Sequence, residues 1–124
     1  MKKLFSALAL AFLKTMDVSS RTDKAVFDPV DQIVAIGDVH GDFVKFRSAL
    51  EMADLIDSKQ SWKGGKTHLV QLGDLPDRGP QTLRIIDLLK KLEKQAPRDG
   101  GRVHILIGNH DAANIYGDLR YALP

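Results

Sequence analysis

The sequence predicts an α/β fold built on a parallel β-α-β sheet. Three short apolar runs, rich in β-branched residues, recur along the chain, and each ends at a glycine followed by aspartate or asparagine. These runs span residues 32–36, 67–72 and 103–107. Short apolar runs without polar alternation are typical of strands buried on both faces. Amphipathic helical patterns lie between them, and this alternation with tight loops favours parallel strands joined by right-handed crossovers.

Two helices are predicted between the runs, and a short third helix after the last one. The first helix has apolar residues at helical spacing, namely Phe43, Phe46, Leu50 and Ala53. The second is expected to begin at Pro80, a residue suited to a first helical turn, and to end before Pro97. Its apolar face is formed by Leu83, Ile85, Ile86, Leu88, Leu89 and Leu92. The third helix is expected to follow Asn109, and residues 58–65 to form a loop.

The composition is that of one ordinary globular domain. The chain has 124 residues, of which 44% are hydrophobic and 27% are charged. The net charge of +2 arises from Lys2, Lys3 and Lys14 in the first 20 residues, opposed there by Asp17 alone. The rest of the chain is therefore neutral, and no nucleic-acid partner is expected. The absence of cysteine excludes disulfides, thiolate metal ligands and cysteine nucleophiles.

Residues 1–20 are predicted to be a signal peptide. Lys2 and Lys3 precede an apolar run, Leu4–Leu13, that is too short to span a membrane. No A-x-A cleavage pattern follows it, and a short helix packed on the domain is the alternative interpretation. We expect a periplasmic or secreted protein, or a cytoplasmic one if the alternative holds, without stable membrane insertion. Residues 21–30 are predicted to be a linker, and residues 31–124 the domain.

Three polar loops carry the chemistry of the sequence. They are GDVHG at residues 37–41, GDLPDRG at 73–79 and GNHD at 108–111. Because each follows a parallel strand, all three are expected at the carboxyl edge of the sheet, where α/β folds bind ligands. Asp38 and His40 are two residues apart, so in an extended exit from the strand they would point the same way and chelate one cation.

The remaining polar residues complete a metal-dependent site. Asp74 has two carboxylate oxygens with which to bridge two cations, and Asn109 offers a carbonyl oxygen. Such ligands suit Mn, Fe or Zn, and two ions about 3.5–4 Å apart can clamp a phosphoryl group. His110 is expected to point away from the metal and protonate a leaving alkoxide, with Asp77 orienting it. Arg78 has the planar fork that binds phosphate.

These loops resemble the three N-terminal signature motifs of the calcineurin-like metallophosphoesterases. The DRG element resembles the PPP-type phosphatases, and the segments DFVKFRSAL, GKTHLVQLGD and NIYGDLRY look most like their bacterial Shewanella-like branch. The resemblance covers residues 32–121 and implies a dinuclear site of two divalent metal ions. It implies the same site roles, with Asp38, His40, Asp74 and Asn109 as metal ligands and His110, Asp77 and Arg78 as catalytic residues. One departure is Asp111, where PPP enzymes usually have glutamate.

The resemblance also implies that this sequence is the N-terminal portion of such a domain. The family has a β-sandwich flanked by helices, and these residues supply the first half of it. Further metal-binding histidines and the second sheet are expected downstream, so one sheet face is expected to be open here. His68 and His104 are expected to be ordinary strand residues, because they lie at the strand ends opposite the loops.

Three functions are consistent with these residues. The first is a metal-dependent phosphoprotein phosphatase, whose partner is a phosphorylated protein. The second is hydrolysis of another phosphoester or of a dinucleotide polyphosphate. His40 weighs against the latter, because enzymes resembling the symmetrical tetraphosphatases tend to have glutamine there. The third is an inactive fragment that binds metal.

Overall fold

The computed structural model describes residues 26–27 and 30–122. The predicted signal peptide, residues 1–20, and most of the predicted linker lie outside these residues. Within the described part of the chain, no helix is long and apolar enough to cross a membrane.

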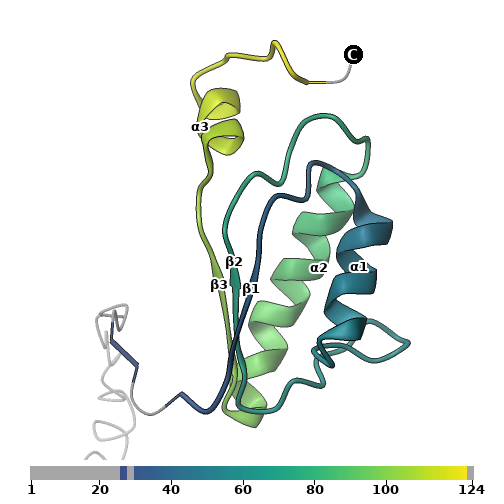
Figure 1. Ribbon diagram of the computed structural model, residues 1–124, viewed down its shortest axis with the longest axis vertical. Helices are drawn as coiled ribbons and strands as arrows, with labels where there is room; N and C mark the ends of the chain where they lie inside the picture. Colours follow the sequence, from purple (N-terminus) through teal and green to yellow (C-terminus); the bar gives the residue numbers. More distant parts are fainter. Residues whose placement is uncertain (1–25, 28–29, 123–124) are drawn as a thin grey trace, which may run out of the picture.

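Three parallel strands form one sheet in the order β1-β2-β3, as predicted (Figure 1). They are β1, Ile33–Ile36; β2, His68–Gln71; and β3, Arg102–Ile105. Helices α1 and α2 lie side by side on one face of the sheet (Figure 1). The helices are α1, Phe43–Met52; α2, Thr82–Gln95; the 3-10 turn η1, Ala96–Asp99; and α3, Asn109–Ile115. The fold thus has one sheet layer and one layer of two crossover helices, with α3 beyond the end of β3.

The hydrophobic core lies between the sheet and these two helices. Val34, Leu69 and Val103 are in register across the three strands and belong to this core. The helices contribute the apolar residues that their periodicity predicted, and the buried ones are Phe43, Phe46 and Leu50 from α1 and Ile85, Leu88, Leu89 and Leu92 from α2. Burial of one apolar side chain of this size contributes about 1.5–3 kcal/mol, so this layer is the main source of stability.

The predicted start of α2 is wrong by two residues. The helix begins at Thr82, and the backbone N–H of Gln81 donates to the carbonyl of Gly41 in another loop (3.1 Å). Pro80 is therefore part of the loop and not the first helical residue. Leu83, predicted for the apolar face, is 76% exposed because it lies outside the stripe of buried residues that begins at Ile85.

The opposite face of the sheet is open, as the family resemblance led us to expect, and the expectation of strands buried on both faces is wrong for β1. Ile33 is 64% exposed and Leu106 is 50% exposed, because both crossover helices cover the same face. Phe27 packs edge-on against His68 and His104, with ring centroids 5.3 and 5.1 Å away. His68 is the first residue of β2, at the end opposite the loops, as predicted, whereas His104 is the third of the four residues of β3, so the prediction is wrong for it. Their rings share a 3.1 Å hydrogen bond.

Candidate metal centre

The first two polar loops are joined by main-chain hydrogen bonds. The N–H groups of Val39 and His40 both donate to the carbonyl of Asp74 (3.1 and 3.0 Å), and Gly41 N–H donates to Leu75 (2.8 Å). Gly41 has a left-handed backbone (φ +69°), and a Cβ on it would overlap the carbonyl of Gly79. Glycine is required there because two backbones pass in direct contact. The loops therefore hold each other in place.

Gln71, the last residue of β2, holds the start of the second loop through its side chain. Its side chain is fully buried. Its amide nitrogen donates to the carbonyls of Gly37 (3.1 Å) and Gly73 (2.9 Å), and its oxygen accepts from Gly73 N–H (2.6 Å). One side chain thus ties the ends of two neighbouring strands together where both loops begin.

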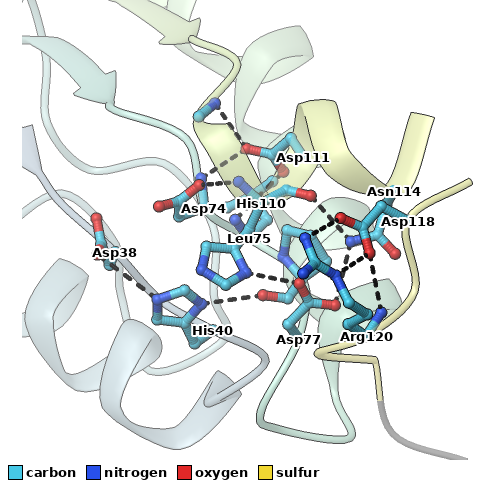
Figure 2. A network of polar contacts seen from close by, with 12 residues as sticks. Asp38, His40, Asp74, Leu75, Asp77, His110, Asp111, Asn114, Asp118 and Arg120 are labelled. Carbon is cyan, nitrogen blue, oxygen red and sulfur yellow. Dashed lines mark hydrogen bonds and ion pairs between the residues drawn. The ribbon is translucent and has the colours of Figure 1, made fainter. Parts of the chain in front are cut away.

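Asp111 connects the third loop to the second (Figure 2). Its Oδ2 accepts from the backbone N–H groups of Asp74 (2.6 Å) and Gly108 (2.8 Å), and its Oδ1 accepts from Leu75 N–H (3.3 Å). In return, the Asp74 carboxylate accepts from His110 N–H at the start of α3 (2.8 Å). Aspartate, where PPP enzymes usually have glutamate, is long enough here to bind both loops.

His40 points one unpaired nitrogen at Asp38. Its Nδ1 lies 3.1 Å from the carbonyl of Pro76, and a carbonyl only accepts, so Nδ1 carries the proton. Nε2 is buried, has no hydrogen-bond partner, and lies 3.5 Å from Asp38 Oδ2. The predicted convergence of the two side chains is present. The predicted extended exit is wrong, because His40 has a left-handed backbone (φ +47°) held by its bond to Asp74.

This arrangement fits a bound cation. In a neutral ring, Nε2 carries a lone pair, and it faces a carboxylate oxygen that also only accepts. A metal-binding histidine commonly donates its other ring N–H to a backbone carbonyl, as His40 does to Pro76. Among the described residues, His40, Asp74 and His110 each offer a ligand atom within 4.8 Å of the other two. The residues present can therefore hold a metal ion.

His110 lies inside this cluster of possible ligands, and its predicted orientation away from a metal stays a prediction. Its ring packs edge-on against His40, with centroids 4.7 Å apart, and it is buried. Its Nδ1 bonds to Asp77 Oδ2 (2.7 Å), as predicted for an orienting carboxylate (Figure 2). Hydrogen bonds from His110, and then from Asn114, lower the pKa of Asp77 below its ordinary value. Asp77 is therefore held as an acceptor at neutral pH.

Asn109 and Arg78 lie at the rim of the site. Asn109 is exposed at the first position of α3, and Arg78 is exposed in the second loop. Arg78 lines an open cleft of about 610 Å³ together with Asp38 and His40. The structure thus brings four of the seven predicted residues into one cluster, namely His40, Asp74, Asp77 and His110. The other three, Asp38, Asn109 and Arg78, lie around this cluster.

Comparison with known proteins identifies the family. The model of the calcineurin-like phosphoesterases matches residues 32–123. The chain belongs to this family. The family predicted from the three motifs is therefore confirmed.

Individual relatives place this phosphoesterase chain near the Shewanella-like branch. It is 48% identical over 95 residues to Shewanella-like protein phosphatase 2 of Arabidopsis thaliana, covering 77% of this chain and 24% of the relative. A crystal structure of the cold-active protein-tyrosine phosphatase of a psychrophilic Shewanella species is similar with a TM-score of 0.74 and 38% identity, over 77% of this chain and 29% of that one. A symmetrical bis(5'-nucleosyl)-tetraphosphatase of Buchnera aphidicola is 37% identical over 76 residues, covering 61% of this chain and 23% of the relative. The chain spans about a quarter of the length of these proteins.

Three residues of this phosphoesterase site were not predicted from the sequence. Gln71 is the last residue of β2 and lies among Leu69, Val70 and Leu72, and a polar amide beside these apolar residues was the signal for its role. Asn114 follows His110 by one helical turn and bonds to Asp77 (3.1 Å). Tyr121 packs on the His110 ring, with centroids 5.2 Å apart, and its carbonyl accepts from the N–H of the predicted phosphate-binding arginine (3.4 Å). Nothing in the local sequence indicates this last contact.

Proposed function

We propose that this protein is a metal-dependent phosphoprotein phosphatase, and that its three loops supply the amino-terminal ligands of a dinuclear centre. The observation that carries the proposal is the buried, unpaired Nε2 of His40 facing the carboxylate of Asp38. The His40 nitrogen is buried while the Asp38 carboxylate is 67% exposed, and a neutral imidazole nitrogen and a carboxylate oxygen this close repel each other less when a cation lies between them.

The proposed ligands follow from the donor atoms at the sheet edge. Asp38, His40 and Asp74 would hold one ion, and Asp74 with Asn109 the other. Mixed imidazole and oxygen ligands suit Mn, Fe or Zn. When bound, such ions supply Lewis-acid charge and lower the pKa of a coordinated water.

The chain's own residues would act around that charge. The Arg78 guanidinium, exposed on the cleft beside Asp38, would hold two phosphate oxygens and orient the substrate. His110 has Nδ1 committed to Asp77, so Nε2 is the ring nitrogen left to give a proton to the leaving alkoxide. Asp77 accepts that hydrogen bond and stabilises the charged form of the ring.

A phosphorylated protein is the proposed substrate because the relatives named above include protein phosphatases. The tetraphosphatase relative makes a dinucleotide polyphosphate the second candidate. His40 favours the first, since the sequence resemblance associates glutamine at this position with the tetraphosphatases. Turnover of a phosphopeptide and of a dinucleotide polyphosphate by the same preparation would decide between them.

The first test is hydrolysis of p-nitrophenyl phosphate by the purified chain with Mn²⁺, beside an Asp74→Asn variant. A metal contributes several kcal/mol to the transition state, so we expect the variant to lose more than about 100-fold in kcat/KM. Equal turnover by both proteins would contradict the proposal. Calorimetry with Mn²⁺ should show binding that His40→Ala removes and His104→Gln, a histidine outside the site, retains. Binding without turnover would support the inactive metal-binding fragment instead.

A further inference from the structure

Asn114 lies on α3 four residues after His110, about one helical turn, and its two side-chain hydrogen bonds go to residues of the site (Figure 2). Its Nδ2 donates to Asp77 Oδ1 (3.1 Å) and to the main-chain carbonyl of His110 (2.9 Å). An amide nitrogen has two protons, so these two bonds use both. The side chain is therefore held by its own helix while it holds the second loop.

The carboxylate of Asp77 has one donor on each oxygen. His110 Nδ1 bonds to Oδ2 (2.7 Å) and Asn114 bonds to Oδ1 (3.1 Å). Within residues 26–27 and 30–122, these are the hydrogen bonds that the structure gives this carboxylate. Its side chain is only 2% exposed, so water does not replace a lost donor without rearrangement. Two donors on opposite oxygens fix the plane of the carboxylate, whereas one leaves it free to rotate.

We infer that Asn114 is a positioning residue: it sets the plane of Asp77, and Asp77 in turn sets the ring plane and the tautomer of His110. A carboxylate only accepts, so the bond at Nδ1 requires the proton on that nitrogen and leaves Nε2 available to the site. The consequence for catalysis rests on the proposed function. The orientation of the His110 ring is a property of the folded chain, so it can be tested whether or not the proposed function is correct.

A purely structural role for Asn114 predicts different behaviour. Asparagine is a poorer helix former than alanine, so Asn114→Ala should leave α3 at least as stable as before. Asn114→Leu keeps nearly the size of the side chain but has no group that can donate to Asp77. If Asn114 only fills space, the leucine variant should behave as the natural protein does. If it acts as a donor, both variants should fail in the same way.

The decisive measurement is ¹⁵N NMR of the imidazole of His110 in the metal-free chain at pH 8. The natural chain should show the tautomer with the proton on Nδ1. Both Asn114 variants should show a mixture, while Ile115→Ala, on the exposed side of the same helix, should be unchanged. Circular dichroism and the fluorescence of the single tryptophan would verify folding of each variant. An unchanged tautomer in a folded Asn114→Leu variant would overturn the inference.

Kinetics with Mn²⁺ provide the second readout. Proton transfer by a positioned side chain contributes about 100-fold or more to a rate, so misplacing His110 through Asn114→Ala should lower kcat by about 10-fold or more. KM should stay within about twofold, because Asn114 touches no substrate. Adding Asn114→Ala to Asp77→Ala should cause no further loss; a further tenfold loss would refute action through Asp77. If the natural chain has no turnover, the proposed function fails while the NMR result still decides the inference.

Discussion

Replacing Gln71 with leucine tests how far one buried side chain holds the first two loops together at the edge of the sheet. The leucine has nearly the same volume but accepts and donates nothing. The substitution would leave the N–H and the carbonyl of Gly73, a buried residue, without their partners. The third group, the carbonyl of Gly37, belongs to an exposed residue and can turn to water.

The structure sets the size of the expected effect. Each buried backbone group left unpaired costs about 1–3 kcal/mol, so the two groups of Gly73 together cost about 4 kcal/mol. Burial of the larger apolar surface of leucine stabilises the folded state by about 1.5 kcal/mol and offsets part of this cost. We therefore expect Gln71→Leu to lower the free energy of unfolding by about 2.5 kcal/mol, a large fraction of the stability of a small domain.

Urea unfolding followed by the fluorescence of Trp62, which is buried, measures this difference. The matched control is Gln32→Leu, because Gln32 is exposed and makes one side-chain bond, to Thr67 (3.0 Å). That variant should lower stability by only about 1 kcal/mol, because the buried hydroxyl of Thr67 is the one group that loses its partner. If Gln71→Leu is as stable as the control, the side chain does not hold the loops, and our account of the loop geometry is wrong.

Three further predictions concern the loops and the histidine pair. Gly79→Ala should lower the free energy of unfolding in urea by about 3 kcal/mol, because the new Cβ would lie 2.6 Å from the backbone of the first loop. Its control is Gly37→Ala, which should leave the free energy of unfolding unchanged because the new Cβ meets no atom within 4 Å. Asp111→Asn should weaken Mn²⁺ binding about 10- to 100-fold in calorimetry, while Asp118→Asn, outside the loops, should not. Burial, and then its positively charged neighbours, lower the pKa of His104, so the unfolded chain binds more protons below about pH 6.5. Stability should therefore fall as the pH drops from 7 to 5, less steeply in His104→Gln, and an equal slope would contradict this.

The fold was predictable because its stability comes from apolar periodicity. Phe43, Phe46 and Leu50 repeat at helical spacing, and this spacing directly reports the buried face of α1. The start of α2 was not predictable, because it depends on a main-chain bond from Gln81 to Gly41, forty residues earlier in the chain. Local propensity favours Pro80 as a first helical residue, and this tertiary contact overrides it.

The residues of the site were predictable as a set, and their conformations were not. The three motifs identify Asp38 and His40 by type and spacing, which fixes the chemistry of their donor atoms. The left-handed turn at His40 depends on a carbonyl from the neighbouring loop, and a sequence pattern contains no information about such a bond. The role of Asn114 likewise depends on which side of α3 faces Asp77.

The left-handed backbone of the site residues has a thermodynamic consequence for ligand binding. His40, Asp74, Asp77 and Arg78 all have positive φ, a conformation that costs a non-glycine residue about 1 kcal/mol or more. Main-chain bonds between the loops maintain this geometry in the ligand-free chain, so the unfavourable conformations are formed during folding. Loops that are already ordered lose little conformational entropy when they bind a ligand. Binding should therefore be fast and should cause little change in structure, since the protein is preorganised for it.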